Sequence, residues 1–195
     1  MVKGMQDVRT FLMMGAPGSG KGTQAKLLAE KVGGEVYSTG ERCREFAAHR
    51  SSFGEKVKEV IDQGDLMPEW FSIYLFEDKL IRLAPGDTLV FEGSGRKVLE
   101  AQTFDEVAAW LRRPYRVVHL KADEQVLRKR LHERLAVQGR ADDAVRAIEL
   151  RFERFREHTE PALEFFRSRG VLLEVNADQP IEQVHTDILS VLKLP

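Results

Sequence analysis

The chain has 195 residues, and its 30 basic and 31 acidic side chains leave a formal net charge of −1. This near balance argues against a partner, such as nucleic acid, that is attracted by the overall charge of a protein. One cysteine, Cys43, excludes an internal disulfide and an all-cysteine metal site, and no apolar run approaches the roughly 20 residues of a membrane span. Residues 1–10 lack the apolar segment of a secretory signal, so we expect a single globular domain, 1–195, in the cytoplasm.

The first predicted strand, Phe11–Met14, leads into a glycine-rich loop, Gly15–Thr23, and then into a helical pattern. Glycines let backbone N–H groups surround an anion, and the start of the helix adds the positive end of its dipole. Lys21 supplies a cation for the outer phosphates, so the loop predicts a phosphate site. The general pattern has a serine or threonine directly after the lysine, where its hydroxyl meets a metal. Here Gly22 follows the lysine and Thr23 comes one residue later.

Four further strands are predicted, at Glu35–Tyr37, Thr88–Phe91, Tyr115–Leu120 and Val171–Val175, with helical patterns between them. This alternation predicts an α/β fold with a mostly parallel sheet. Ligands of such sheets bind beyond the carboxyl ends of the strands. The residues that follow each strand are therefore the candidate site residues.

A helical segment follows the second strand. Ser38 or Thr39 is expected to cap a helix that carries Arg44 about one turn from its start, and capping alone would explain the hydroxyls. Two more helices are predicted at Phe53–Gln63 and Glu69–Leu83, joined by the turn 64–68. Residues 39–83 therefore form a helical insertion long enough to act as a small mobile flap.

The third strand ends in Glu92-Gly93-Ser94-Gly95-Arg96. A carboxylate at this position suits a water bound to a metal, and the glycines permit a ligand to approach closely. Arg96 is placed to hold a phosphate through two hydrogen bonds. The alternative is a flexible turn with a solvated arginine.

Arginines gather after the fourth strand. A helix is predicted from Asp123 to Leu135, then a short connection at 136–139, then a long helix from Asp142 to Arg167 that breaks or kinks at Pro161. Three arginines flank the connection or lie on a helix face directed toward it: Arg134, Arg140 and Arg151. Three others are expected to be solvated: Arg128, Arg146 and Arg154. The five histidines are scattered, and we expect all of them to be structural.

A phosphate loop, a lysine, a carboxylate at a strand end and several arginines fit phosphoryl transfer. That reaction needs no covalent nucleophile, but it needs positioned substrates and neutralised charge. A cleft that closes on its substrates also excludes the water that would hydrolyse the donor.

The run GAPGSGKGTQA resembles the phosphate loop of adenylate kinases, and the resemblance continues through STGERCR, GDLMP, Gly139–Asp143 and HTEPALEFF. It covers nearly the whole chain in the family's order. It implies the three-layer fold of phosphate-loop nucleoside monophosphate kinases, with a five-stranded parallel sheet. The implied parts are a core (1–38, 84–134 and 141–195), an acceptor-binding insertion (39–83) and a short lid (135–140) without zinc. The implied reaction is the magnesium-dependent ATP + AMP = 2 ADP, with a monomer as the expected state.

The same resemblance implies a role for each matched residue. The donor ATP would be held by Gly18, Ser19, Gly20, Lys21, Gly22, Thr23, Arg134 and Gln179. The acceptor would be held by Thr39, Arg44, Asp65, Leu66, Met67, Gly93, Ser94, Gly95, Arg96, Glu100, Arg140 and Arg151. The catalytic set would be Lys21, Arg96, Arg134, Arg140 and Arg151, with Thr23 and, through water, Glu92 at the metal.

Two departures from the family pattern leave the acceptor open. The family usually has Asp-Gly-Phe-Pro-Arg where this chain has Glu92–Arg96, so the aromatic and the proline are lost. The family also carries a glutamine where this chain has Glu100, and an ionised glutamate accepts hydrogen bonds but cannot donate them. Glu100 would therefore suit guanine, so GMP is an alternative acceptor. The short lid motivates UMP or CMP, and a nucleotide-binding protein with weak catalysis is a further alternative.

Overall fold

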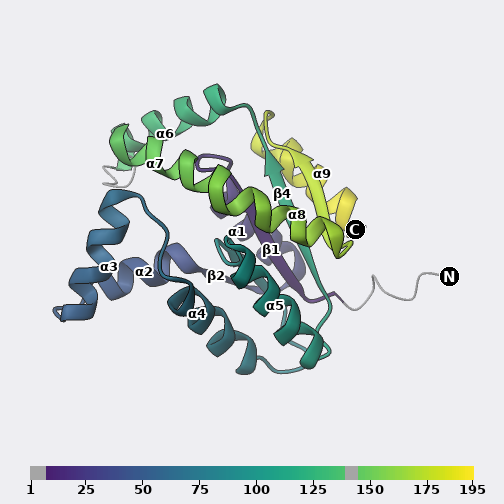
Figure 1. Ribbon diagram of the computed structural model, residues 1–195. Coiled ribbons are helices and arrows are strands. Elements are labelled where there is room, and N and C mark those ends of the chain that lie inside the picture. Colours follow the sequence, from purple (N-terminus) through teal and green to yellow (C-terminus); the bar gives the residue numbers. More distant parts are fainter. Residues whose placement is uncertain (1–7, 139–144) are drawn as a thin grey trace.

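The computed structural model describes residues 8–138 and 145–195. Its five strands form one sheet in the order β2-β3-β1-β4-β5, and every neighbouring pair is parallel (Figure 1). The predicted α/β fold with a five-stranded parallel sheet is confirmed. The strands are β1 (Thr10–Gly15), β2 (Glu35–Ser38), β3 (Leu89–Glu92), β4 (Tyr115–Lys121) and β5 (Leu172–Asn176).

The central strand β1 is buried along its whole length. Successive side chains of a strand point to opposite faces, and here each face meets a core of its own. Leu12 and Met14 belong to one hydrophobic cluster, whereas Phe11 and Met13 belong to another. A continuous apolar run is therefore what a central parallel strand requires.

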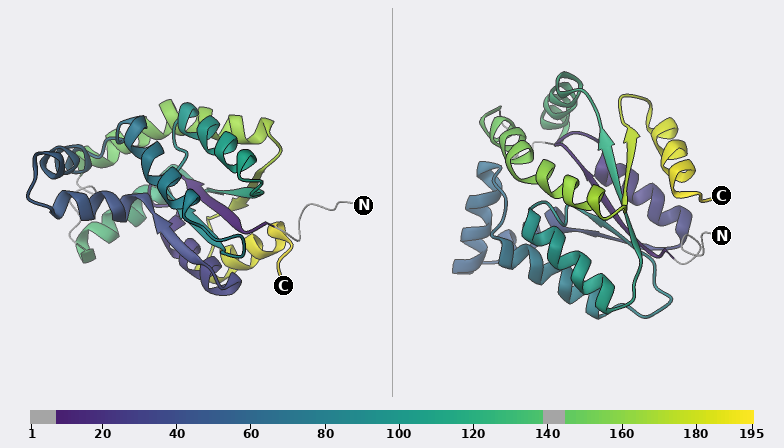
Figure 2. Two further views of the ribbon diagram at one scale, coloured as in Figure 1. Left: turned by 90° about the horizontal axis from the view of Figure 1, so that it is seen from below. Right: turned by 45° about the vertical axis from the view of Figure 1, so that its right-hand side comes forward.

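Helices cover both faces of the sheet and complete the three layers (Figure 2). One face packs against α4 (Glu69–Ile81), α5 (Val98–Trp110) and α8 (Glu160–Ser168). The other face packs against α1 (Lys21–Val32) and α9 (Ile181–Leu192). None of the described helices is both long and apolar enough to cross a membrane.

The insertion after β2 consists of α2 (Thr39–Ala48), α3 (Ser52–Gln63) and α4, with α4 ending two residues before the predicted Leu83. Its helices share a small apolar cluster built on Cys43, Val57, Phe71 and Leu75. The insertion therefore has packing of its own in addition to the contacts of α4 with the sheet.

The arginine-bearing helices differ from the prediction in two ways. First, α6 (Glu124–Gln138) runs three residues beyond the predicted end at Leu135, so most of the expected connection at 136–139 is helical. Second, the long helix consists of α7 (Val145–Arg154), a π-helical turn η2 (Phe155–Thr159) and α8. The π-turn places Pro161 in the first turn of α8, where the missing N–H of a proline is tolerated.

Candidate active site

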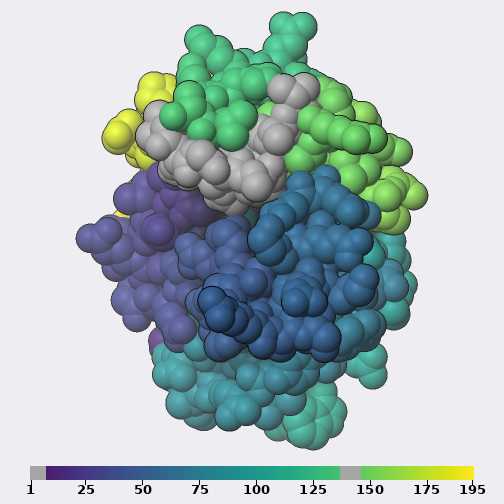
Figure 3. All heavy atoms as spheres, turned by 90° about the vertical axis from the view of Figure 1, so that its left-hand side faces the viewer, coloured from purple at the N-terminus to yellow at the C-terminus, as the bar shows by residue number. Residues whose placement is uncertain are grey.

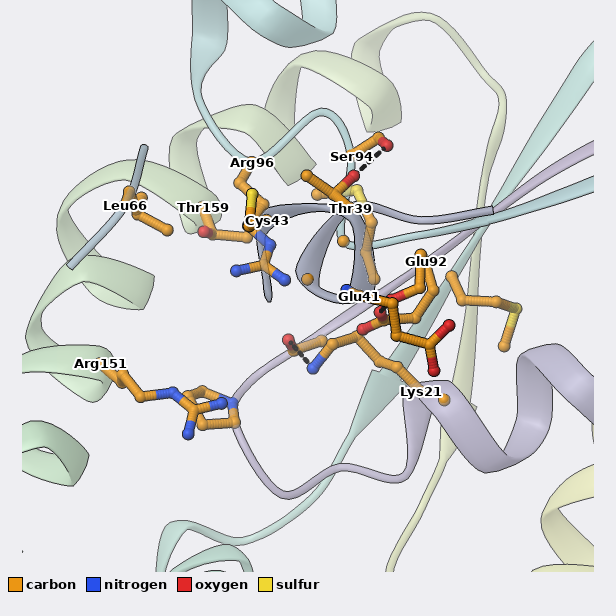
Figure 4. A pocket seen from close by; sticks show the side chains of 18 of the residues that line it. Lys21, Thr39, Glu41, Cys43, Leu66, Glu92, Ser94, Arg96, Arg151 and Thr159 are labelled. Atoms are coloured by element: carbon orange, nitrogen blue, oxygen red, sulfur yellow. Dashed lines mark hydrogen bonds between the residues drawn. The ribbon is translucent and has the colours of Figure 1, made fainter. Parts of the chain in front are cut away.

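A cavity of about 540 Å³ opens at the carboxyl ends of the strands. Its walls come from the phosphate loop, the start of α2, the α3–α4 loop, the β3–α5 loop, α6 and α7 (Figure 4). Most of the predicted site residues meet in this one place. Those that line the cavity are Gly18, Gly20, Lys21, Gly22, Thr23, Thr39, Arg44, Asp65, Leu66, Met67, Glu92, Gly93, Ser94, Arg96, Glu100, Arg134 and Arg151.

The phosphate loop is shaped by glycines that no other residue replaces without strain. Gly18 has a φ of 82°, and a Cβ there would lie 2.7 Å from the carbonyl oxygen of Leu127. Gly20 has a φ of 88° and is the N-cap of α1, where no side chain caps the helix. The first N–H groups of α1 are therefore left for an anion.

Lys21 folds back onto the loop. Its Nζ donates to the carbonyl oxygens of Gly15 and Ala16, at 2.9 Å in each case. Burial lowers the pKa of Lys21 from 10.5 to about 7, and the charges of Arg96 and Arg151 add to this effect although Glu92 opposes it. The lysine therefore sits in a cationic environment that a bound phosphate would neutralise.

Glu92 is an acidic group whose charge acts on Lys21. Its Oε2 accepts a hydrogen bond from the Ser38 hydroxyl at 2.6 Å. Burial opposes its ionisation, but the charges of Arg96 and Lys21, with the Ser38 hydrogen bond, hold its pKa below the usual value. An ionised Glu92 and the hydroxyl of Thr23 line the same cavity, and they suit Mg²⁺ that is bound mainly by substrate phosphates and water. Among the described residues, no three His, Cys, Asp or Glu side chains form a metal cluster.

The β3–α5 loop turns through two glycines in the left-handed region, Gly93 with a φ of 83° and Gly95 with a φ of 72°. A Cβ on Gly93 would lie 2.4 Å from Nη2 of Arg96, so the guanidinium folds over this residue. A proline at position 95 would need a negative φ, so this loop path excludes the proline that the family usually has there. The lost aromatic and the lost proline therefore belong to one change in the path of the β3–α5 loop.

Glu100 is 2% exposed and lines the cavity. Its Oε2 accepts from the backbone N–H of Arg96 at 2.8 Å, and Ser72 also hydrogen-bonds to the carboxyl group. Burial raises the pKa of Glu100 in spite of these bonds. The hydroxyls of Thr39 and Ser94 lie 2.8 Å apart, so this wall of the cavity carries polar groups where the family pattern has an aromatic.

Four predicted residues do not line the described cavity. Ser19 is buried, and its Oγ lies 3.5 Å from Nζ of Lys21. Gly95 is also buried and does not line the cavity. Gln179 lies in the β5–α9 loop, where its Nε2 donates to the Asn176 carbonyl at 2.9 Å. Arg140 falls outside the described residues, as do its neighbours in the 139–144 segment.

The cavity also contains residues that sequence reasoning missed, among them Arg130 and Arg154. Arg130 donates to the carbonyl of Ala177 at 3.0 Å, and its position one turn before Arg134 on α6 was a usable signal. Arg154 was expected to be solvated, but its Nε donates to Oδ1 of Asp65 at 2.8 Å.

Arg128 and Arg146, the other two arginines expected to be solvated, differ from each other. Arg128 pairs with Glu124 and Glu149, and its guanidinium lies 4.7 Å from the centre of the Phe152 ring. Arg146 is exposed, as expected.

The helical insertion after β2 touches α7. At the end of α3, a Cβ on Gly64 would lie 2.7 Å from the Ala147 carbonyl of α7, so the two backbones are in close contact. In the space-filling view the surface of α3 meets that of α7 directly (Figure 3). The cavity is therefore walled on both sides in this conformation.

The comparisons with known proteins agree with this geometry. A family model described as adenylate kinase matches residues 13–171. The adenylate kinase of Caulobacter sp. (strain K31) is 36% identical over 187 residues, which cover 94% of this chain and 98% of that protein. The adenylate kinase of Thermobifida fusca (strain YX) is 34% identical over 183 residues, covering 93% and 97%. Adenylate kinase 1 of Synechocystis sp. (strain ATCC 27184 / PCC 6803 / Kazusa) is 32% identical over 190 residues, covering 97% and 100%.

Proposed function

The chain belongs to the adenylate kinase family, and on that premise we propose that it transfers the γ-phosphoryl group of ATP reversibly to AMP. One observation carries the proposal: among the described residues, a phosphate loop and six arginines line a single cavity between the core and the acceptor insertion. The six are Arg44, Arg96, Arg130, Arg134, Arg151 and Arg154.

The donor side begins at the phosphate loop. The uncapped N–H groups of α1 bind the donor phosphates, and Lys21 exchanges its two carbonyl partners for phosphate oxygens. Arg134 approaches the donor from α6, and the β5–α9 loop with Gln179 lies beside its base. Thr23 and, through water, Glu92 would hold Mg²⁺, which would neutralise charge on the donor phosphates.

The acceptor side begins at α2. Thr39 and Arg44 hold the acceptor together with Asp65, Leu66 and Met67 of the α3–α4 loop. An oxygen of the acceptor phosphate attacks the γ-phosphorus, the bond to the β–γ bridging oxygen breaks, and ADP leaves. Arg96, Arg151 and Arg140 neutralise the charge on the group in transit. Segment 135–140 is the proposed lid, of which Leu135–Gln138 extends α6.

GMP is a second candidate acceptor, and Glu100 is the observation that favours it. An ionised Glu100 presents two acceptors, which match the two N–H donors on the edge of guanine. A neutral Glu100 presents one donor and one acceptor, as an amide does, and so matches adenine. Burial raises the pKa of Glu100, which favours the neutral form that matches adenine, and the relatives are adenylate kinases, so AMP stays the first candidate.

The test is a phosphotransfer assay with ATP, Mg²⁺ and a panel of AMP, GMP, CMP and UMP. We expect AMP to give the highest kcat/KM, with ADP as the product on both sides. AMP ranking below another base would overturn the choice of acceptor, and ATP binding without any turnover would overturn catalysis. We further propose a monomer without zinc in the cytoplasm. Gel filtration, metal analysis and cell fractionation test these three points, respectively.

A further inference from the structure

Ser38 and Glu92 face each other across two neighbouring strands. They are register partners in the parallel pair β2–β3, and each is the last residue of its strand. Since Ser38 donates to Oε2 of Glu92, one carboxylate oxygen is held and the other is left to the cavity. An aspartate is one methylene shorter, so its carboxylate would lie farther from the hydroxyl from the same backbone position.

The same hydroxyl begins the acceptor insertion. Ser38 is the N-cap of α2, and its Oγ accepts from the backbone N–H of Glu41 at 3.3 Å. A serine hydroxyl has one donor and two acceptor sites, so both bonds form at once. The next residue, Thr39, makes a second link to the β3–α5 loop through Ser94. Helix α2, which carries Arg44, is thus hydrogen-bonded at its start to the end of β3 and to the loop that follows β3.

These contacts join the two halves of the site. Glu92 lies on the donor side, close enough to Lys21 and Arg96 that their charges lower its pKa. Thr39 and Arg44 lie on the acceptor side and belong to α2. The Ser38 hydroxyl therefore links the Glu92 carboxylate directly to the start of α2.

We propose that Ser38 is a positioning residue that sets the Glu92 carboxylate and the acceptor helix α2 relative to each other. The inference rests on the proposed function, because it concerns the placing of the two substrates of that reaction. The competing explanation is a simple helix cap. Ser51 provides the matched control, since it caps α3 through Gly54 at 3.0 Å and does not line the cavity.

The experiment compares Ser38→Ala, Ser38→Thr and Ser51→Ala. We expect Ser38→Ala to lower kcat and to weaken AMP binding, each by about tenfold, since a hydrogen bond to a charged group is lost. Ser38→Thr keeps the hydroxyl and should restore most of both quantities. Ser51→Ala should change neither, although it removes an equivalent cap. AMP binding is measured by calorimetry without ATP or metal, so this readout does not depend on turnover.

A double-mutant cycle completes the test. Glu92→Asp keeps the charge but shortens the reach, so it should weaken AMP binding even with Ser38 intact. Because both changes break the same bond, Ser38→Ala combined with Glu92→Asp should weaken AMP binding little more than either change alone. Additive effects, or a Ser38→Ala variant that behaves like Ser51→Ala, would overturn the inference. If the panel ranks another monophosphate above AMP, the cycle is run with that ligand, so the two proposals fail separately.

Discussion

The guanidinium of Arg154 on α7 donates to Asp65 in the loop between α3 and α4, with 2.8 Å between Nε and Oδ1. The two residues are 89 positions apart in the chain, and both line the cavity. The contact ties the helical insertion after β2 to the helix that carries Arg151.

Breaking this ion pair should weaken acceptor binding. Because both side chains are partly exposed, we expect Arg154→Ala to raise the KM for the acceptor only about threefold, with kcat nearly unchanged. Exchanging the two charges, with Asp65→Arg and Arg154→Asp together, should recover much of the loss. If the exchanged pair is as impaired as the single variant, the ion pair is not what matters.

Lys21 should take up a proton when ATP binds. The pKa of Lys21 is about 7 in the ligand-free protein, so the lysine is mostly neutral at pH 8. Phosphate charges favour the protonated form, so binding at pH 8 should take up about one proton. Calorimetry in buffers of different ionisation enthalpy measures this number.

Two substitutions at Lys21 separate its charge from its titration. Lys21→Arg is always charged, so it should bind ATP without proton uptake. Lys21→Met should abolish turnover with little loss of fold. Unchanged uptake in Lys21→Arg would assign the proton to another group.

The protonation of Glu100 should set the preference for the acceptor base. The pKa of this carboxyl is raised, so its neutral, amide-like form is populated to a higher pH than for an ordinary glutamate. The ratio of kcat/KM for AMP to that for GMP should therefore rise as the pH falls. Glu100→Gln should raise activity on AMP and make the ratio independent of pH. A ratio that varies with pH equally in both proteins would contradict this role.

Gly93 should not tolerate a side chain. An alanine there would combine a φ of 83° with a Cβ 2.4 Å from Arg96 Nη2. We expect Gly93→Ala to cost about 1 kcal/mol of stability and to lower kcat by more than the stability loss explains, because Arg96 must move. Gly86→Ala is the control, because a Cβ at that position would meet no heavy atom within 4 Å. Equal melting temperatures and equal kcat for both variants would refute the argument.

His119 should make the protein sensitive to acid. Its pKa is lowered from 6.5 to about 4, chiefly by burial, with Glu174 opposing the effect. The native state binds fewer protons than the unfolded state in this range, so the contribution is complete above pH 6.5 and is lost as the pH falls through about 4. The shift corresponds to roughly 3 kcal/mol. His119→Gln should remove much of the decline in unfolding free energy between these pH values, and His132→Gln, at an exposed site, should not.

Residue patterns that act over short distances gave correct predictions. Three features depend on neighbours within a few positions: the apolar run at Phe11–Met14, the phosphate loop, and the helix cap that was expected at Ser38 or Thr39 and is found at Ser38. Their local chemistry allows few alternatives, so the strands, the loop and the start of α2 are where they were expected.

Features that depend on distant partners were not predictable in the same way. Nothing in the local sequence shows that Arg154 meets Asp65, or that Ser38 reaches Glu92. The extension of α6 to Gln138 was also missed, because Gly139 suggested an earlier turn. The roles of individual residues in catalysis stay predictions until the variants above are measured.

The π-helical turn at Phe155–Thr159 changes the direction in which side chains point along the helix formed by α7, η2 and α8. A single extra residue rotates everything beyond it by about 100° relative to a regular α-helix. Upstream, Arg151 faces the cavity, and downstream, Leu163 and Phe166 face the sheet. Deleting one residue within the turn would restore a regular α-helix. Then either Arg151 would no longer face the cavity, or Leu163 and Phe166 would no longer face the sheet. The irregular turn therefore lets one length of helix serve both the active site and the core.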